Sequence, residues 1–147
     1  MARWGGEPGS QEGQFYYPRG LAIGPDDVVY VADSGNNRVQ KFDLEGNVQK
    51  AWGKFGFAWR GADMGRFDVP WGITTDQDGN VYVSDTSNAR IQKFQADGQP
   101  LLKWGRDGSF DGAFFFPVAW RWISLAIFTW PTRATIVSRS SIHAEVS

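Results

Sequence analysis

Two Asp–Arg pairs have the residue types and spacing best suited to chemistry in this chain. Asp33 precedes Arg38, and Asp85 precedes Arg90, with a short polar segment between the partners of each pair. A carboxylate and a guanidinium at the end of a hairpin could contact a polar ligand. The same groups could instead bond to each other across the turn and fix the register of the two strands. Because the pair occurs twice in the same setting, we favour the structural interpretation.

Side chains that bind metal ions are sparse. The chain has no Cys, which excludes a disulfide scaffold and a thiolate zinc site, and its one His is His143. Asp26 with Asp27, and Asp76 with Asp78, could suggest calcium, but both pairs lie in segments typical of turns. The spacing of an EF-hand, with its closing Glu, is absent. We therefore expect no metal ion, no other cofactor and no catalytic constellation.

A cluster of aromatic and basic residues lies within residues 54–66. Phe55, Phe57, Trp59 and Arg60 together have the composition of a binding hot spot. Loops that a rigid scaffold presents are common places for binding, which supports this interpretation. Packing between neighbouring structural units explains the same residues, and the composition favours packing slightly over binding.

The elements that position these residues are two copies of one repeat. Residues 15–53 match residues 67–105 without a gap at a constant offset of 52, and 16 of the 39 aligned positions are identical. Chance does not produce such a match, and a repeat of this kind determines the whole architecture. Arg19 and Trp71 occupy equivalent positions in the two copies, and they are further candidate binding residues.

Each copy predicts four short strands with turn-forming residues between them. High aromatic and glycine contents agree with strands joined by tight turns. The second and third strands alternate in side-chain character, which predicts that they are half-buried. Four strands per repeat are typical of a β-propeller blade, so we expect an all-β fold of four-stranded antiparallel blades. The expected strands span residues 20–23, 28–32, 38–42 and 48–52 in the first copy, and 72–75, 81–84, 90–94 and 100–104 in the second.

The segments YVADSGNNRVQKF (residues 30–42) and GNVYVSD (residues 79–85) resemble the NHL repeat, as do the Phe-x-x-Pro-x-Gly starts and the Trp-Gly ends. The family motif ends in residues like Asn-His-Leu, where this chain has Asn-Asn-Arg and Asn-Ala-Arg. The resemblance covers about residues 1–117 and implies a propeller of about six blades. It divides the chain into the end of a preceding blade with its connector (1–14), a first blade (15–53), a connector (54–66), a second blade (67–105), the start of a third blade (106–117) and an off-pattern tail (118–147).

Two complete blades are fewer than the four to eight or so that close a propeller. We therefore expect an incomplete propeller, either a fragment or a unit that associates with other copies through its open blade faces. The tail over residues 118–147 loses the repeat pattern. Read one base out of frame, its forced codons agree with a further NHL blade, so we hypothesise that a frameshift after Pro117 produced it. An apolar run in this tail is too short for a membrane span and contains Arg121 and Pro131.

The function predicted from these features is a propeller scaffold that binds a protein or a small ligand at one of its faces. Acidic residues outnumber basic ones over residues 1–117, which disfavours nucleic acid as a partner. An alternative follows from the resemblance, because some NHL-type propellers are peptide-amidating lyases with a metal bound by His. Under that alternative the chain is a fragment of such an enzyme, and the metal site lies in blades outside it.

Overall fold

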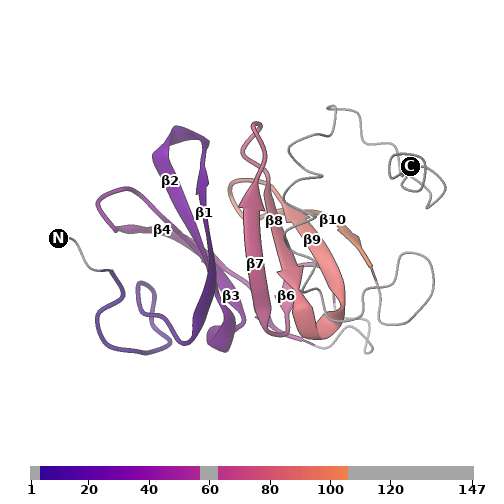
Figure 1. Cartoon of the computed structure of the whole chain (residues 1–147), viewed down its shortest axis with the longest axis horizontal. Coiled ribbons are helices and arrows are strands. Elements are labelled where there is room, and N and C mark those ends of the chain that lie inside the picture. Colours follow the sequence, from indigo (N-terminus) through magenta and orange to yellow (C-terminus); the bar gives the residue numbers. More distant parts are fainter. Residues whose placement is uncertain (1–3, 57–62, 106–147) are drawn as a thin grey trace, which may run out of the picture.

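The computed structural model describes residues 4–56 and 63–105, which form two four-stranded antiparallel sheets (Figure 1). In both sheets the strands are adjacent in the order in which they follow along the chain. The expected all-β fold of four-stranded blades is confirmed. The first sheet contains β1 (Pro18–Gly24), β2 (Val28–Asp33), β3 (Arg38–Phe42) and β4 (Val48–Trp52), and the second contains β7 (Pro70–Thr75), β8 (Val81–Asp85), β9 (Arg90–Phe94) and β10 (Pro100–Trp104).

The strand bounds follow the repeat closely, except that β1 and β7 each begin two residues earlier than the pattern predicts. A short parallel pair, β5 (Lys54–Phe55) and β6 (Arg66–Phe67), lies outside the two sheets and was not foreseen from the repeat. It ties the two ends of the connector together. The tail over residues 118–147, with the frameshift hypothesis that concerns it, lies outside the described residues.

Each β2–β3 type hairpin closes through a single turn of 3-10 helix. In the first blade this turn is Ser34–Asn36 and in the second it is Thr86–Asn88. The residue after each turn has a left-handed backbone, with φ of 53° at Asn37 and 48° at Ala89. Asn tolerates this conformation, whereas Ala has no side-chain group that favours it. The turns place Asp33 opposite Arg38 and Asp85 opposite Arg90 in the strand registers.

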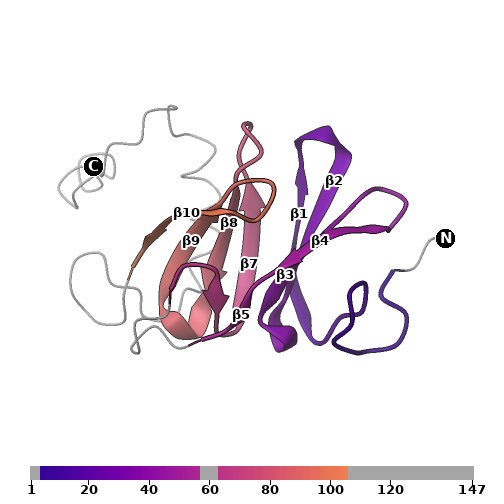
Figure 2. The same ribbon diagram turned by 180° about the vertical axis from the view of Figure 1, so that it is seen from behind.

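The two blades pack face to face around one apolar cluster. The sheets are nearest at β1 and β7 and diverge toward β4 and β10 (Figures 1 and 2). Gly20 makes this approach feasible, because a Cβ at its position would lie 2.5 Å from the carbonyl oxygen of Trp71. Buried residues of this cluster are Val28, Tyr30, Ala32, Val39, Phe67, Ile73, Val81, Val83 and Phe94.

A second apolar cluster covers the opposite face of the first blade. It consists of Val29, Val31 and Phe42, against which Trp4 and Phe15 from the N-terminal segment pack. The six residues of β2 are consequently all buried, so the prediction of a half-buried second strand is wrong for this blade. Alternation along the strand is real, but one set of side chains faces the second blade and the other faces the N-terminal segment.

The end of a preceding blade, expected within residues 1–14, has a counterpart in the contacts of Trp4. Its ring stacks on Phe42 at 5.7 Å between centroids, as Trp52 lies 6.0 Å from Phe94. Trp4 also lies against Gly46, as Trp52 lies against Gly98. Trp4 thus makes the same contacts with the first blade as Trp52 makes with the second. Within the described part of the chain, no helix has the length and apolarity needed to cross a membrane.

Candidate binding surface

Asp33 is the centre of a polar network at one end of the first blade. Its carboxylate accepts hydrogen bonds from the backbone N–H of Tyr16 at 2.8 Å and from Arg38 Nε at 2.8 Å. The side-chain amides of Asn36 and Gln40 donate to the same carboxylate at 2.9 and 3.1 Å. One buried acidic group therefore joins β2, the hairpin turn, β3 and the segment before β1.

Arg38 extends this network to the segment between Trp4 and β1. Its terminal nitrogens donate to the carbonyl oxygens of Ser10 and Gln11, both at 2.7 Å, and to that of Gln14 at 2.9 Å. Gln40 also donates to Gln14 and accepts from the backbone N–H of Gly13. The segment has no regular secondary structure, so these side chains supply partners for its backbone groups.

Asp85 repeats the network in the second blade. The backbone N–H of Asp68 donates to it at 2.7 Å and Arg90 Nε at 2.7 Å. Asn88 and Gln92 donate to the same carboxylate, at 2.9 and 3.0 Å. Burial raises the pKa of Asp85, against the lowering effect of these hydrogen bonds and of Arg90. Every one of these partners lies 52 residues after its counterpart in the first blade.

The burial and saturation of these groups favour the structural interpretation of the two Asp–Arg pairs. The side chains of Asp33 and Asp85 are 0% exposed, and those of Arg38 and Arg90 are 13% and 4% exposed. A ligand has no access to the carboxylates without opening the hairpin. The pairs are suited to holding each connector against its blade, which fixes the surfaces beside them.

The Arg19 and Trp71 side chains come together at the edge where the two sheets converge. The guanidinium carbon of Arg19 lies 4.0 Å from the centroid of the Trp71 ring, within the range of a cation–π contact. Trp71 remains 46% exposed. The two candidate residues therefore form one surface feature that spans both blades, although they are far apart in sequence.

Two tyrosines that sequence reasoning missed lie immediately before β1. Tyr17 is 67% exposed and Tyr16 is 48% exposed, and their rings meet edge to face at 4.7 Å between centroids. Tyr17 has a φ of 46°, and Val69 at the equivalent position has 52°. A positive φ is unfavourable for such residues, so the shared hairpin geometry imposes it. The repeat comparison contained a signal, because Tyr16 and Tyr17 stand where the second copy has Asp68 and Val69.

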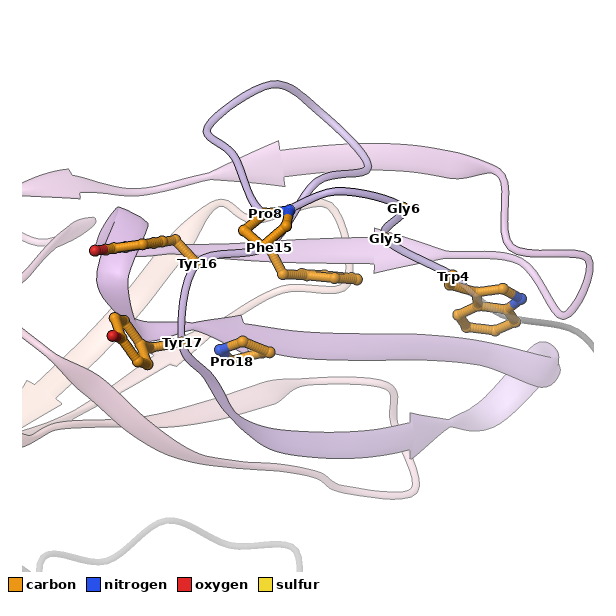
Figure 3. A pocket seen from close by; sticks show the side chains of 8 residues that line it. All are labelled: Trp4, Gly5, Gly6, Pro8, Phe15, Tyr16, Tyr17 and Pro18. Carbon is orange, nitrogen blue, oxygen red and sulfur yellow. The ribbon is translucent and has the colours of Figure 1, made fainter.

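A groove of about 420 Å³ runs from these tyrosines to Trp4 (Figure 3). Tyr16 and Tyr17 lie at one end of it and the Trp4 ring at the other, with the Phe15 ring between them. Gly5, Gly6, Pro8 and Pro18 complete the lining. The lining is mostly apolar. We define the candidate binding surface as Tyr16, Tyr17, Arg19 and Trp71 together with this groove.

The other predicted binding residues are not placed. Phe57, Trp59 and Arg60 lie outside the described residues, as does the side chain of Phe55. Their role, either in binding or in packing between the blades, stays a prediction from the sequence. Among residues 4–56 and 63–105 there is no group of three or more His, Cys, Asp or Glu side chains that could hold a metal ion.

A separate polar cluster lies on the outer face of the second blade. Tyr82 donates its hydroxyl hydrogen to Asp76 at 3.0 Å, and Lys93 Nζ lies 3.6 Å from the same carboxylate oxygen. Burial alone would raise the pKa of Asp76, but hydrogen bonds from Asn80 and Tyr82 and the charge of Lys93 lower it. Asp76 also caps the turn before β8, so this cluster has a local structural role.

Known proteins resemble the chain in both sequence and fold. The NHL repeat family model matches residues 15–42 and 67–94. Peptidyl-alpha-hydroxyglycine alpha-amidating lyase 1 of Drosophila melanogaster is 32% identical over 94 residues, which is 63% of this chain and 17% of the lyase. The protein brain tumor of the same organism is 43% identical over 102 residues, 68% of this chain and 9% of that protein. The chain therefore spans less than a fifth of either relative.

A solved structure agrees with the fold. The hydrazine synthase of Kuenenia stuttgartiensis superposes with a TM-score of 0.50 and 18% identity, covering 67% of this chain and 26% of that one. This likeness concerns the fold alone. The two matches to the repeat model coincide with β1–β3 and with β7–β9, and each includes one Asp–Arg pair with the Asn and Gln side chains that donate to its carboxylate. The chain is an NHL-repeat protein, and its described residues form two blades of a β-propeller.

Proposed function

We propose that the chain is a propeller scaffold that binds a protein or peptide through the candidate binding surface of Tyr16, Tyr17, Arg19 and Trp71. The observation that carries the proposal is the contact between Arg19 and the exposed Trp71 ring beside two exposed tyrosines. Trp, Tyr and Arg are the residue types most enriched in the energetic centres of protein interfaces. Here Arg19 contacts Trp71, and Tyr16 and Tyr17 precede Arg19 by three and two residues in the chain.

The fixed framework beneath this surface supports the same proposal. Asp33 holds the backbone N–H of Tyr16, and the backbone N–H of Gly35 donates to the Tyr16 carbonyl oxygen at 2.8 Å. A Cβ at Gly35 would also lie 2.4 Å from the Tyr16 ring. The aromatic rings therefore start from a rigid backbone, which reduces the conformational entropy lost when a partner binds.

A phage-displayed library of random dodecapeptides tests the proposal. Peptides enriched on the immobilised chain are synthesised with a fluorescent label, and their affinity is measured by anisotropy. Trp71→Ala should weaken the binding of an enriched peptide by about fivefold or more, because truncation of a central aromatic residue typically costs more than 1 kcal/mol. Arg19→Ala should weaken it as well.

Leu101→Ala is the matched control, since Leu101 is 37% exposed but lies in β10, at the opposite edge of the second sheet from Trp71 in β7. This variant should bind as the unmodified chain does. Failure to enrich any peptide, or equal affinities for the Trp71→Ala and Leu101→Ala variants, contradicts the proposal.

A second candidate function rests on the likeness to the amidating lyase of Drosophila. Under it, the two blades are part of the framework of a lyase whose metal ligands lie outside residues 4–56 and 63–105. Release of peptide amide from a peptidyl-α-hydroxyglycine, assayed with the product of the uninterrupted genomic locus, tests this candidate. Turnover by that product supports the lyase function. If there is no turnover, the lyase function is rejected and the binding scaffold remains the proposed function.

A further inference from the structure

The packing between the two blades serves as a template for the faces that they leave open. Ile73, on the face of the second blade that meets the first, is 4% exposed. Leu21 holds the equivalent position in the first blade and is 62% exposed, and Ile23 two residues later is 66% exposed. The first blade therefore leaves open at Leu21 the apolar position that it covers at Ile73 of its neighbour.

The outer face of the second blade shows the complementary pattern. Tyr30 and Trp52 of the first blade pack toward the second, where Tyr30 is 1% exposed and Trp52 is half-buried. Their equivalents Tyr82 and Trp104 are more open, and Trp104 is 40% exposed. The outer face of the second blade thus has, in Tyr82 and Trp104, the same two aromatic residues that the first blade uses to contact its neighbour.

A hydroxyl group without a partner gives independent support. Ser34 donates its hydroxyl hydrogen across the blade interface to the carbonyl oxygen of Pro70. Thr86 stands at the equivalent position of the second blade, and its Oγ1 is buried with no hydrogen-bond partner among the described residues. A buried hydroxyl without a partner costs free energy. The equivalent of Pro70 in the first blade is Pro18, whose carbonyl a neighbouring blade would present to Thr86.

Glycine also recurs at the position of closest approach. Gly20 lets β1 lie against β7, since a Cβ there would meet the backbone of Trp71. Gly72 holds the same position in β7, so the second blade has glycine where a further first strand would approach. This face is more polar than the inner interface, because Thr74 replaces Ala22 and Asn80 replaces Val28.

We infer that a second copy of this chain docks head to tail, with the Tyr82 and Trp104 face of one copy on the Leu21 and Ile23 face of the next. The contact is heterologous, so it propagates until the ring closes. Propellers close with about four to eight blades, which corresponds to about two to four copies of a two-blade chain.

Trp4 determines how strongly the copies associate. It lies on Phe42 and Gly46 of its own blade, where Trp104 of a neighbouring copy would lie by analogy with Trp52 on Phe94 and Gly98. Docking therefore requires that Trp104 displace Trp4. The unmodified chain should associate weakly, and a chain without the Trp4 ring should associate more strongly.

Sedimentation velocity of the full chain, from low micromolar to several hundred micromolar concentration, tests this inference. The Trp4→Ala variant should form the ring at a concentration about tenfold or more below that required by the unmodified chain. Adding Leu21→Glu to it should abolish association, because a carboxylate would enter the apolar interface. Adding Met64→Glu, at an exposed residue of the connector between the two blades, should leave association intact.

Thr86→Val tests the same interface without lowering the stability of the monomer. It removes a hydroxyl that has no partner within the described chain, so the urea midpoint of the monomer should stay the same or rise. Association should nevertheless weaken, since the bond to Pro18 of the next copy is lost. The inference is overturned if the Trp4→Ala variant stays monomeric at every concentration, or if Leu21→Glu and Met64→Glu affect association equally.

Discussion

The Nε atom of Arg90 lies 2.7 Å from the Asp85 carboxylate, and both side chains are almost completely buried at the closed end of the β8–β9 hairpin. In the first blade, Arg38 lies 2.8 Å from Asp33 in the same geometry, although Arg38 is more exposed. Each pair binds backbone groups of the segment that enters its blade. The ion pair is therefore part of the joint between successive blades as well as of the hairpin.

Asp85→Asn should destabilise the chain by about 3 kcal/mol in the free energy of unfolding, because it leaves the buried Arg90 without its counter-charge. Equilibrium unfolding in urea at neutral pH measures this effect. Asp97→Asn is the control, since Asp97 is exposed in the turn before β10 and accepts only a local bond from Gln99. The structural interpretation of the pair fails if the two variants unfold at the same urea concentration.

The pKa of Asp76 lies below its usual 3.8, because the hydrogen bonds from Asn80 and Tyr82 and the charge of Lys93 outweigh the effect of burial. A lowered folded-state pKa stabilises the fold above the unfolded-state pKa, and this contribution is lost as pH falls through the folded-state value. Asp76→Asn should therefore be less stable than the unmodified chain at pH 7. The difference between the two should shrink as the pH falls below about 3.8.

Urea midpoints measured between pH 2 and pH 7 check this expectation about Asp76. Asp78→Asn is a matched control two residues away in the same turn, where only the backbone N–H of Asp78 bonds to Asp76. Its difference from the unmodified chain should not follow the same course with pH. A pH-independent difference for Asp76→Asn would show that the carboxylate acts through shape and not through charge.

Strand positions and blade architecture were predictable because the same pattern of strand and turn residues occurs in both copies of the repeat. Residues such as Asp33 and Asp85, found at the same offset before an Arg, indicated a hairpin with a fixed register. The burial of both faces of β2 was not predictable, because it depends on Trp4 and Phe15, which lie outside the repeat unit and return to cover it.

The candidate binding surface was predictable only in part. Arg19 and Trp71 were candidates as separate residues, but their contact requires knowing that β1 and β7 lie side by side. Tyr16 and Tyr17 precede the expected strand, and their exposure follows from a left-handed backbone at Tyr17 that no local residue preference favours. Tertiary packing of the hairpin turn beneath them imposes that conformation.

Gly20→Ala should separate the blades. The added Cβ would lie 2.5 Å from a backbone oxygen and 3.1 Å from the backbone nitrogen of Ile73, and neither atom can move without its strand. Overpacking of this kind typically costs about 1–3 kcal/mol. Urea unfolding measures the loss, with Leu21→Ala as the control at an exposed neighbour. Equal midpoints for the two variants would contradict the close packing of β1 on β7.

The hypothesis of a frameshift after Pro117 makes a prediction about the gene. Shifting the reading frame by one base at that point should extend the NHL pattern through a third blade, including an Asp–Arg pair at the spacing of Asp33 and Arg38. Sequencing the coding DNA across codon 117 and its flanks checks this. A shifted frame that lacks the repeat pattern rejects the hypothesis, and residues 118–147 then stand as encoded.

Trp52 and Trp104 hold equivalent positions, but among the described residues a neighbouring blade packs against Trp52 and none packs against Trp104. Trp52 lies within 6.0 Å of both Tyr30 and Phe94, between ring centroids, at the interface of the two blades. Trp104 contacts Tyr82 within its own blade and is 40% exposed. Trp52→Ala should lower the free energy of unfolding by about 3 kcal/mol, in line with truncation of a core aromatic residue. Trp104→Ala should lower it by about 1 kcal/mol or less.

Urea unfolding at a concentration where the chain is monomeric compares the two tryptophan variants directly. Both substitutions remove the same side chain from the last residue of a fourth strand, so the difference between them isolates the contribution of packing between blades. A large difference means that a blade gains most of its stability from the neighbour that covers it. Equal losses in the free energy of unfolding would mean that each blade is stabilised mainly by contacts within its own sheet. An open blade face would then contribute little free energy to association with a partner.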